Sequence, residues 1–418
     1  MRHVLATLIC VLILTSCATH SGQKIVPTPI IQAQQEVPEE QLLDVGITAF
    51  ESAELTEEKA KEEGTNPEIR KAETHFVAYH LKNTLQQSSQ WGAVRVVPAS
   101  TDESEMKVTG EILESNGENL IVRIDVSDAR GNTWLQKTYK AEATPQFFTG
   151  NVPGEKDPFQ DLYNTIANDM ALHKNQLDPA EIERLRMIAR LRFAQGFSPE
   201  AFGDYMVKDK RGKFKIKRLP ADDDPMMARL LKIRDREYMY VDTLNEYYDE
   251  FYNDMWQAYE NWRKLSQQEI AARREIKRSA ILKQIGGALM LALAIGLDAG
   301  GVPGTNALQN ILIIGGGAVI IDGINVSKEA EIHSAAIEEL SESFGNEMKP
   351  VVMEFQGRQY ELTGSAEEQY TRWRELLREI YFTETGFGPD ASIEETEPDS
   401  AGEEVIEKEP GVRSQEPE

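Results

Sequence analysis

The stretch LIVRIDVSDARGNTWLQKTY, residues 120–139, predicts a β-hairpin. Leu120–Val126 and Thr133–Tyr139 have the alternating pattern of half-buried strands, and Asp128-Ala129-Arg130-Gly131 between them is a turn sequence. Gly131 stands where a hairpin turn favours a positive φ. The chain around this hairpin is therefore expected to be built on an antiparallel meander.

The residues before the hairpin predict three further strands and a helix. Met106–Leu113 and Val94–Val97 are the two nearest strands, and Leu43, Val45 and Ile47 alternate in a third. Asn66-Pro67-Glu68 is a helix start, and this helix is expected to run to about Ser88. A strand, a helix, a strand and a meander predict an α+β fold with a small α/β sandwich domain at residues 41–150.

This order of elements, with the turn VSDARGNTW at residues 126–134, resembles the periplasmic α/β domains of curli-secretion-type and penicillin-binding-protein-activator lipoproteins. The resemblance covers residues 41–143. It implies a binding domain and no enzyme.

A mostly helical region is expected to follow. Asp178-Pro179 and Ser198-Pro199 are helix starts within residues 151–225, and Lys213–Leu219 has the pattern of a short strand. Met226–Ile285 then contains neither Gly nor Pro, so one helix of about 90 Å is expected there. Its apolar stripe is either an aromatic partner-binding face or a seam against another helix of this chain, and we favour the seam. The stripe consists of Val241, Leu244, Tyr248, Phe251, Met255, Tyr259 and Trp262.

A basic stretch leads from this helix into a glycine-rich apolar segment. Residues 226–350 are expected to form a helical hairpin whose tip, residues 285–321, lies between that helix and a second one at 326–344. The tip would cross a membrane, dip into one leaflet with the basic residues on anionic headgroups, or be buried within the protein or between subunits. We favour burial, because thirteen apolar residues (285–297) cover only about 20 Å. The basic residues are Arg273, Arg274, Lys277 and Arg278, and the tip glycines are Gly286, Gly287, Gly296, Gly315, Gly316 and Gly317.

The C-terminal part predicts a second hairpin, a helix and a tail. Residues 351–355 and 359–362 flank Gly357, and Ser365–Tyr381 is the expected helix, so that residues 351–382 form one unit. Residues 383–418 are acidic and contain few large apolar residues, which predicts a disordered tail. Solvation is its simplest role, and binding of a basic partner is the alternative.

The N-terminus carries the most specific motif. Residues 1–16 have a short charged start and an apolar run, as a signal peptide does, and end in Leu14-Thr15-Ser16 before Cys17. This resembles the lipobox of bacterial lipoproteins, which implies cleavage before Cys17, acylation of Cys17 and attachment to a membrane through lipid. Ala18 follows the cysteine, and in that family a residue other than Asp there implies sorting to the outer membrane. Residues 17–40 are then expected to be a flexible tether.

Composition and motif searches narrow the function classes. A net charge of −25 argues against nucleic acid as a partner, and two cysteines, Cys10 and Cys17, give no internal disulfide framework. We find no catalytic motif, cofactor fingerprint or metal-ligand spacing. His75 and His80 are five residues apart and are interpreted as surface or boundary residues. Asp222, Asp223 and Asp224 complement the dipole of the long helix.

These observations favour a non-enzymatic lipoprotein of the bacterial cell envelope, on the periplasmic face of the outer membrane. It would act as an interaction scaffold in envelope assembly or transport, with an envelope protein as partner. The first alternative is a membrane-active homo-oligomer, a collar or pore built from the glycine-rich hairpin. The second is a cell-wall hydrolase whose catalytic residues have no recognisable motif.

Overall fold

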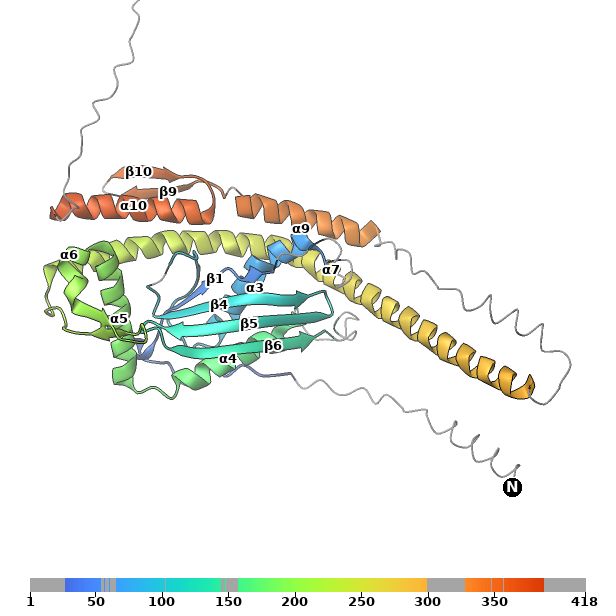
Figure 1. Ribbon diagram of the computed structural model, residues 1–418. Coiled ribbons are helices and arrows are strands. Elements are labelled where there is room, and N and C mark those ends of the chain that lie inside the picture. The colour runs from blue at the N-terminus through green and yellow to red at the C-terminus, as the bar shows by residue number, and fades with distance from the viewer. Residues whose placement is uncertain are drawn as a thin grey trace, which may run out of the picture.

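The structure is a computed structural model that describes residues 27–386 except 54–55, 57–59, 61–64, 102, 144–146, 148–156, 299–327, 347 and 356. The described chain has an α+β fold, as the sequence predicts. Figure 1 shows a sheet with helices packed on it, and one very long helix, α7, that crosses the molecule and extends beyond it. Cys17, Gly315, Gly316 and Gly317 lie outside the described residues.

The main sheet of the described chain has the order β3-β1-β4-β5-β6, with β2 beside β4. Strand β1 is parallel to both β3 and β4, whereas β4, β5 and β6 form the predicted antiparallel meander. Gly131 has φ +88° in the turn between β5 and β6, as expected. The strands are β1 (Val45–Thr48), β2 (Glu51–Ser52), β3 (Val94–Val97), β4 (Met106–Ser115), β5 (Asn119–Asp128) and β6 (Thr133–Glu142).

Three helices pack against this sheet. Helix α3 (Pro67–Gln87) begins where predicted, because the Asn66 side chain accepts from the backbone N–H groups of Glu68 and Ile69. Helices α4 (Gln160–Lys174) and α5 (Pro179–Phe197) follow the sheet in the chain. Their residues Ile166, Met170 and Leu185 belong to the same hydrophobic core as Val108 and Ile124 of the sheet. One core is therefore shared by residues from 43 to 185.

The N-terminal segment of the described chain is held against α4. Asp161 accepts from the Thr28 N–H at 2.9 Å, and Asn168 accepts from the Ile31 N–H at 2.7 Å. Asn164 donates to the Thr28 carbonyl and Asn168 to the Pro29 carbonyl. The expectation of a flexible tether is therefore wrong for residues 28–31, because polar side chains of α4 bond their backbone.

Short elements connect α5 to the long helix. They are α6 (Pro199–Phe202), the 3-10 turn η3 (Gly203–Tyr205), β7 (Met206–Lys208) and β8 (Phe214–Ile216), while another 3-10 turn, η1 (Glu39–Gln41), precedes β1. Strand β8 confirms the expected strand but is shorter than residues 213–219. Asp178 caps α5 as predicted, whereas the Ser198 side chain forms no capping bond to α6.

Helix α7 (Pro225–Asp298) is longer than the sequence predicts. It begins one residue before the expected start at Met226, and Asp224 accepts from the N–H groups of Met226 and Met227. It then continues through Gly286, Gly287 and Gly296 without interruption. Among the described residues, no helix has a stretch both long and apolar enough to cross a membrane.

The remaining elements pack on α7. Helix α9 (Lys328–Asn346) lies against α7 and α3, where Ile337 joins Phe76 and Met255 in one cluster. Strands β9 (Val351–Phe355) and β10 (Arg358–Leu362) form the predicted hairpin, with Gly357 at φ +75°. Helix α10 (Ala366–Thr385) starts at a capping box of Ser365 and Glu368.

The apolar stripe of α7 is a seam within the chain. All seven of its side chains are at most 5% exposed, and they contact α3, α9, α10 and the β9–β10 hairpin through two buried clusters. Trp373 of α10 is fully buried in one of these clusters. The seam interpretation is confirmed, and the partner-binding face is wrong.

Helix α7 also covers the edge of the sheet at β3. The Asn245 side chain accepts from the Val96 N–H and donates to the Val96 carbonyl, both at 2.8 Å. Beside it, Arg95 of β3 donates to Asp242 at 2.6 Å. The side chain of Asn245 thus takes the place of a neighbouring strand.

Candidate functional site

The feature that distinguishes this fold is the point where α7 leaves the body. Ser266 and Gln267 are buried, whereas the described side chains between Gln268 and Arg278 are exposed or half-buried. We call residues 268–298 the arm; as a helix it is about 46 Å long. The buried polar residues that fix its base are called the arm root: Arg70, Glu73, Ser115, Asn116, Asp157, Tyr259, Arg263 and Ser266.

The turn between β4 and β5 forms one wall of the arm root. Gly117 in this turn has φ +81°, and a Cβ there would lie 2.8 Å from the Arg263 carbonyl oxygen and 2.9 Å from Ser266 Cβ. Because it has no side chain, Gly117 lets α7 touch the turn. The Ser266 hydroxyl then donates to the Asn116 carbonyl at 2.8 Å.

A buried ion pair joins α7 to the start of α4. Arg263 donates to Asp157 at 2.6 Å, and the two side chains are 1% and 0% exposed. Burial alone would raise the pKa of the Asp157 carboxyl, but the Arg263 guanidinium and the Phe159 N–H outweigh it and the pKa lies below its usual value. The guanidinium also lies over the Tyr259 ring, 4.2 Å from its centroid.

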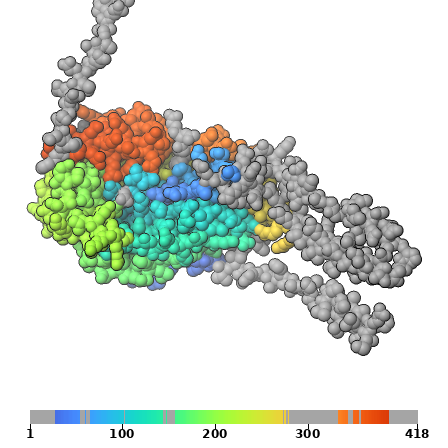
Figure 2. Space-filling view, in the orientation of Figure 1, coloured from blue at the N-terminus to red at the C-terminus, as the bar shows by residue number. Residues whose placement is uncertain are grey.

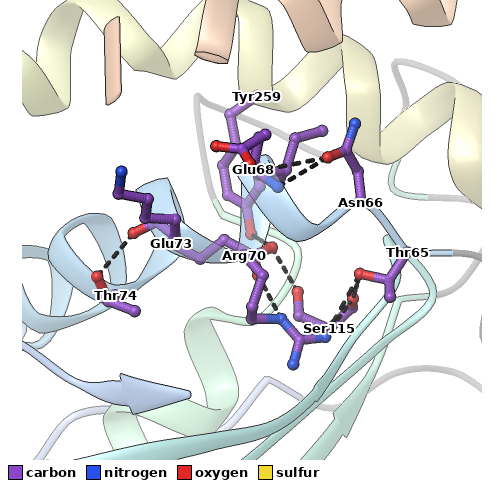
Figure 3. A network of polar contacts seen from close by, with 10 residues as sticks. Thr65, Asn66, Glu68, Arg70, Glu73, Thr74, Ser115 and Tyr259 are labelled. Atoms are coloured by element: carbon purple, nitrogen blue, oxygen red, sulfur yellow. Dashed lines mark hydrogen bonds and ion pairs between the residues drawn. The ribbon is translucent and has the colours of Figure 1, made fainter. Parts of the chain in front are cut away.

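A second buried cluster joins α7 to α3 and β4 (Figure 3). The Glu73 carboxylate accepts from Tyr259 at 2.6 Å, from Ser115 at 2.5 Å and from Arg70 at 3.1 Å. Arg70 also donates to the Ser115 carbonyl at 2.9 Å. Since Glu73 is fully buried, these bonds require Tyr259, and hence α7, to stay in place.

Histidines of α3 lie against α7 next to the arm root. His80 is 6% exposed, with Nδ1 2.7 Å from the Tyr252 hydroxyl and Nε2 2.9 Å from the Gln160 amide oxygen. Gln160 uses its amide nitrogen as a donor to Thr84 and Asn164, so His80 carries its proton on Nε2 and accepts from Tyr252. The expectation of surface or boundary positions is wrong for His80, because α3 buries it under α4 and α7.

These histidines predict acid sensitivity. Burial, with a smaller contribution from Lys71, lowers the pKa of His75 to about 4, and burial also lowers the pKa of His80. Below pH ~6.5 the unfolded chain binds protons that the folded chain does not, so the free energy of unfolding should fall between pH ~6.5 and ~4. The pKa shift of His75 corresponds to a loss of at most about 3 kcal/mol in the free energy of unfolding. Because the side chain is only half-buried, the actual loss should be smaller.

Urea unfolding at about pH 7 and about pH 4.5 measures this loss. A variant with both His75→Gln and His80→Gln should be less stable at neutral pH but lose less on acidification. An equal loss in both proteins would assign the acid sensitivity to other groups.

Two of the four basic residues expected at lipid headgroups have described side chains, Arg274 and Arg278. Arg274 forms an ion pair with Glu118 in the turn between β4 and β5, and its side chain stays 47% exposed. The side chain of Arg278 is exposed. The side chains of Arg273 and Lys277 lie outside the described residues, while Gly286, Gly287 and Gly296 lie on the helical backbone of the arm.

Sequence reasoning missed the inward-facing charges of the arm root. Arg263 follows Tyr259 by four residues and therefore shares its buried face. A charged residue in line with an apolar stripe was the signal. Asp157 and Glu73 gave no such signal, because their partners are distant in the sequence.

Within the described residues, no group of three or more His, Cys, Asp or Glu side chains could hold a metal ion. Comparison with known proteins gives no family: no family model matches the chain, and no curated protein matches it.

Proposed function

We propose that this protein is a lipid-anchored scaffold of the bacterial envelope that holds a rigid helical arm at a fixed position beside the membrane. The arm root carries this proposal, because buried charges and close backbone contact fix the base of the arm to the α/β body. The lipobox at Cys17 supports the lipid anchor. The outer membrane, with the body in the periplasm, is the location that Ala18 favours.

The anchor and the arm would lie at the same end of the molecule. Thr28 bonds Asp161, one helical turn after Asp157, and Asp157 pairs with Arg263 at the arm root. Between Cys17 and Thr28 the chain can span at most about 40 Å. A lipid on Cys17 would therefore keep the arm root near the membrane surface, and the arm would present its residues there to an envelope partner.

The first test is replacement of the lipidated residue. We expect Cys17→Ser to move the protein from the membrane fraction to the soluble fraction and to abolish labelling with palmitate, because no acyl chain can then be attached. Cys10→Ser is the matched control, since Cys10 lies before the cleavage site and should change neither result. Membrane association of the Cys17→Ser protein would refute the anchor.

Cross-linking in cells tests the arm. A photo-cross-linking residue in place of the exposed Arg278 should capture an envelope protein in cells expressing the lipidated form, whereas one in place of exposed Leu172 on α4 should not. Equal capture at both sites would refute the proposal that the arm binds the partner. The Cys17→Ser protein should be a monomer on sizing, and a stable ring would instead favour the collar or pore.

A further inference from the structure

A strongly basic hairpin lies in this acidic protein. Residues 206–218, MVKDKRGKFKIKR, contain strands β7 and β8 and carry seven Lys or Arg against one Asp. Six of these seven side chains are exposed, and the seventh, Lys213, is half-buried. We call residues 206–218 the basic hairpin; its cations are Lys208, Lys210, Arg211, Lys213, Lys215, Lys217 and Arg218.

Carboxylates neutralise little of this charge. Within the described part of the chain, the ion pairs of the basic hairpin are Lys215 with Asp209 at 3.6 Å and Lys217 with Asp204 at 3.8 Å. Arg218 and Lys208 lie over the rings of Tyr205 and Phe214. A concentration of positive charge of this kind attracts an anionic segment.

The basic hairpin lies at the end of the sheet opposite the arm root. The Phe214 N–H donates to the Arg130 carbonyl at 3.0 Å in the turn between β5 and β6, and Lys213 donates to the Gly131 carbonyl. The arm root contacts the turn between β4 and β5 instead. Because β5 has ten residues, these two ends are about 30 Å apart. The basic hairpin is therefore remote from the membrane-facing end proposed above.

Helix α10 ends at the same end of the molecule as the basic hairpin. Arg378 donates to the Gly196 carbonyl at 3.1 Å, and Arg229 at the start of α7 lies 3.8 Å from Glu384. Figure 2 shows the surface of α10, in orange-red, next to the lime-coloured region that follows α5. A pocket of about 250 Å³ lies between α5 and the basic hairpin, lined by Glu103, Arg192, Gln195, Gly196, Lys208 and Phe214. Gly196 thus touches α10 and lines the pocket beside the basic hairpin.

The chain beyond α10 has the complementary charge. Gly386 closes the helix with φ +69°, and residues 387–418 follow with 11 Asp or Glu against 2 Lys or Arg. A random-coil chain of this length, 32 residues, would have a root-mean-square reach of about 30 Å, enough to extend over the basic hairpin. We propose that the basic hairpin and its pocket bind an acidic polypeptide, and that their occupant is residues 387–418 of the same chain.

Because residues 387–418 belong to the same chain as the basic hairpin, weak ion pairs are sufficient for them to bind it. Each exposed pair contributes less than about 1 kcal/mol and is screened by salt. A tethered segment, however, is present at an effective concentration on the order of millimolar. The segment would mask the basic hairpin at low salt and leave it at high salt, so that a more acidic partner could displace it.

Cross-linking of the full chain tests the contact. A zero-length carbodiimide reagent should join Lys208, Lys210 or Lys215 to carboxylates of residues 390–409, and the yield should fall sharply in about 0.5 M salt. Lys264, exposed at the arm root, is the control and should form no such links. Equal yields at Lys264 and the basic hairpin would overturn the proposal. Links between isotopically distinct copies would also overturn it, because the occupant would then be the tail of a second molecule.

Binding in trans tests the occupant. A peptide of residues 387–418 should bind the chain truncated after Gly386 at least about tenfold more tightly than the full chain, whose own segment competes. Lys210→Gln with Arg211→Gln should weaken binding to the truncated chain without unfolding it, since both side chains are exposed. A peptide with Glu replaced by Gln should not bind. Equal affinity for the full and truncated chains, or equal binding of the neutral peptide, would overturn the proposal.

Discussion

Arg263→Met should lower the free energy of unfolding by about 3–5 kcal/mol at neutral pH, because it leaves the Asp157 carboxylate buried without its cation. The pair is 1% and 0% exposed, so solvent cannot replace the lost partner. Without Arg263, burial would raise the pKa of Asp157, and the variant should lose less stability in mild acid than at neutral pH. Urea unfolding at both pH values measures the two effects.

The adjacent residue provides the matched control. Lys264→Met makes the same kind of change one position along α7, where the side chain is exposed, and should change stability by less than about 0.5 kcal/mol. Combining Arg263→Met with Asp157→Leu should recover part of the loss, since no buried charge then remains. If Arg263→Met costs no more than Lys264→Met, the arm root does not depend on this ion pair.

Gly117→Ala should destabilise the protein by about 2–4 kcal/mol, since a positive φ disfavours a side chain and the new Cβ would overlap α7. The overlapping atoms are the backbone oxygen of Arg263 and the Cβ of Ser266, so no flexible side chain can move aside to relieve it. The arm should therefore change direction relative to the sheet. Spin-label distances between β6 and the arm would record that change.

Gly357→Ala is the control that separates the backbone strain of a positive φ from the overlap of a new Cβ with α7. Gly357 has φ +75° in the turn between β9 and β10, but nothing lies within 4 Å of a Cβ built there. This variant should therefore cost only about 1 kcal/mol and leave the spin-label distances unchanged. Equal losses for the two variants would mean that Gly117 serves the turn and not the approach of α7.

Local patterns predicted most elements of the fold. Alternation located β4, β5 and β6, and capping residues located the starts of α3 and α5. These signals act within a few residues of one another, so a single sequence contains them. The stripe of α7 likewise predicted its own burial, although it could not identify α3 and α10 as the partners.

The arm root could not be predicted, because its partners are distant in the sequence. Asp157 and Arg263 are 106 residues apart, and Glu73 and Tyr259 are 186 apart. The docking of residues 28–31 was missed for another reason: these residues form all four bonds through backbone groups, which give no pattern in the sequence. The glycines near the end of α7 led to the prediction that the helix stops and a tip begins there. The helix continues instead, since each glycine costs a helix only about 1 kcal/mol.

The covering of β3 by Asn245 has a consequence for any movement of α7. If α7 detached, β3 would expose unpaired N–H and C=O groups along a short, apolar strand, which is a template for pairing with another molecule. Detachment would thus carry a risk of self-aggregation that a rigid helix avoids.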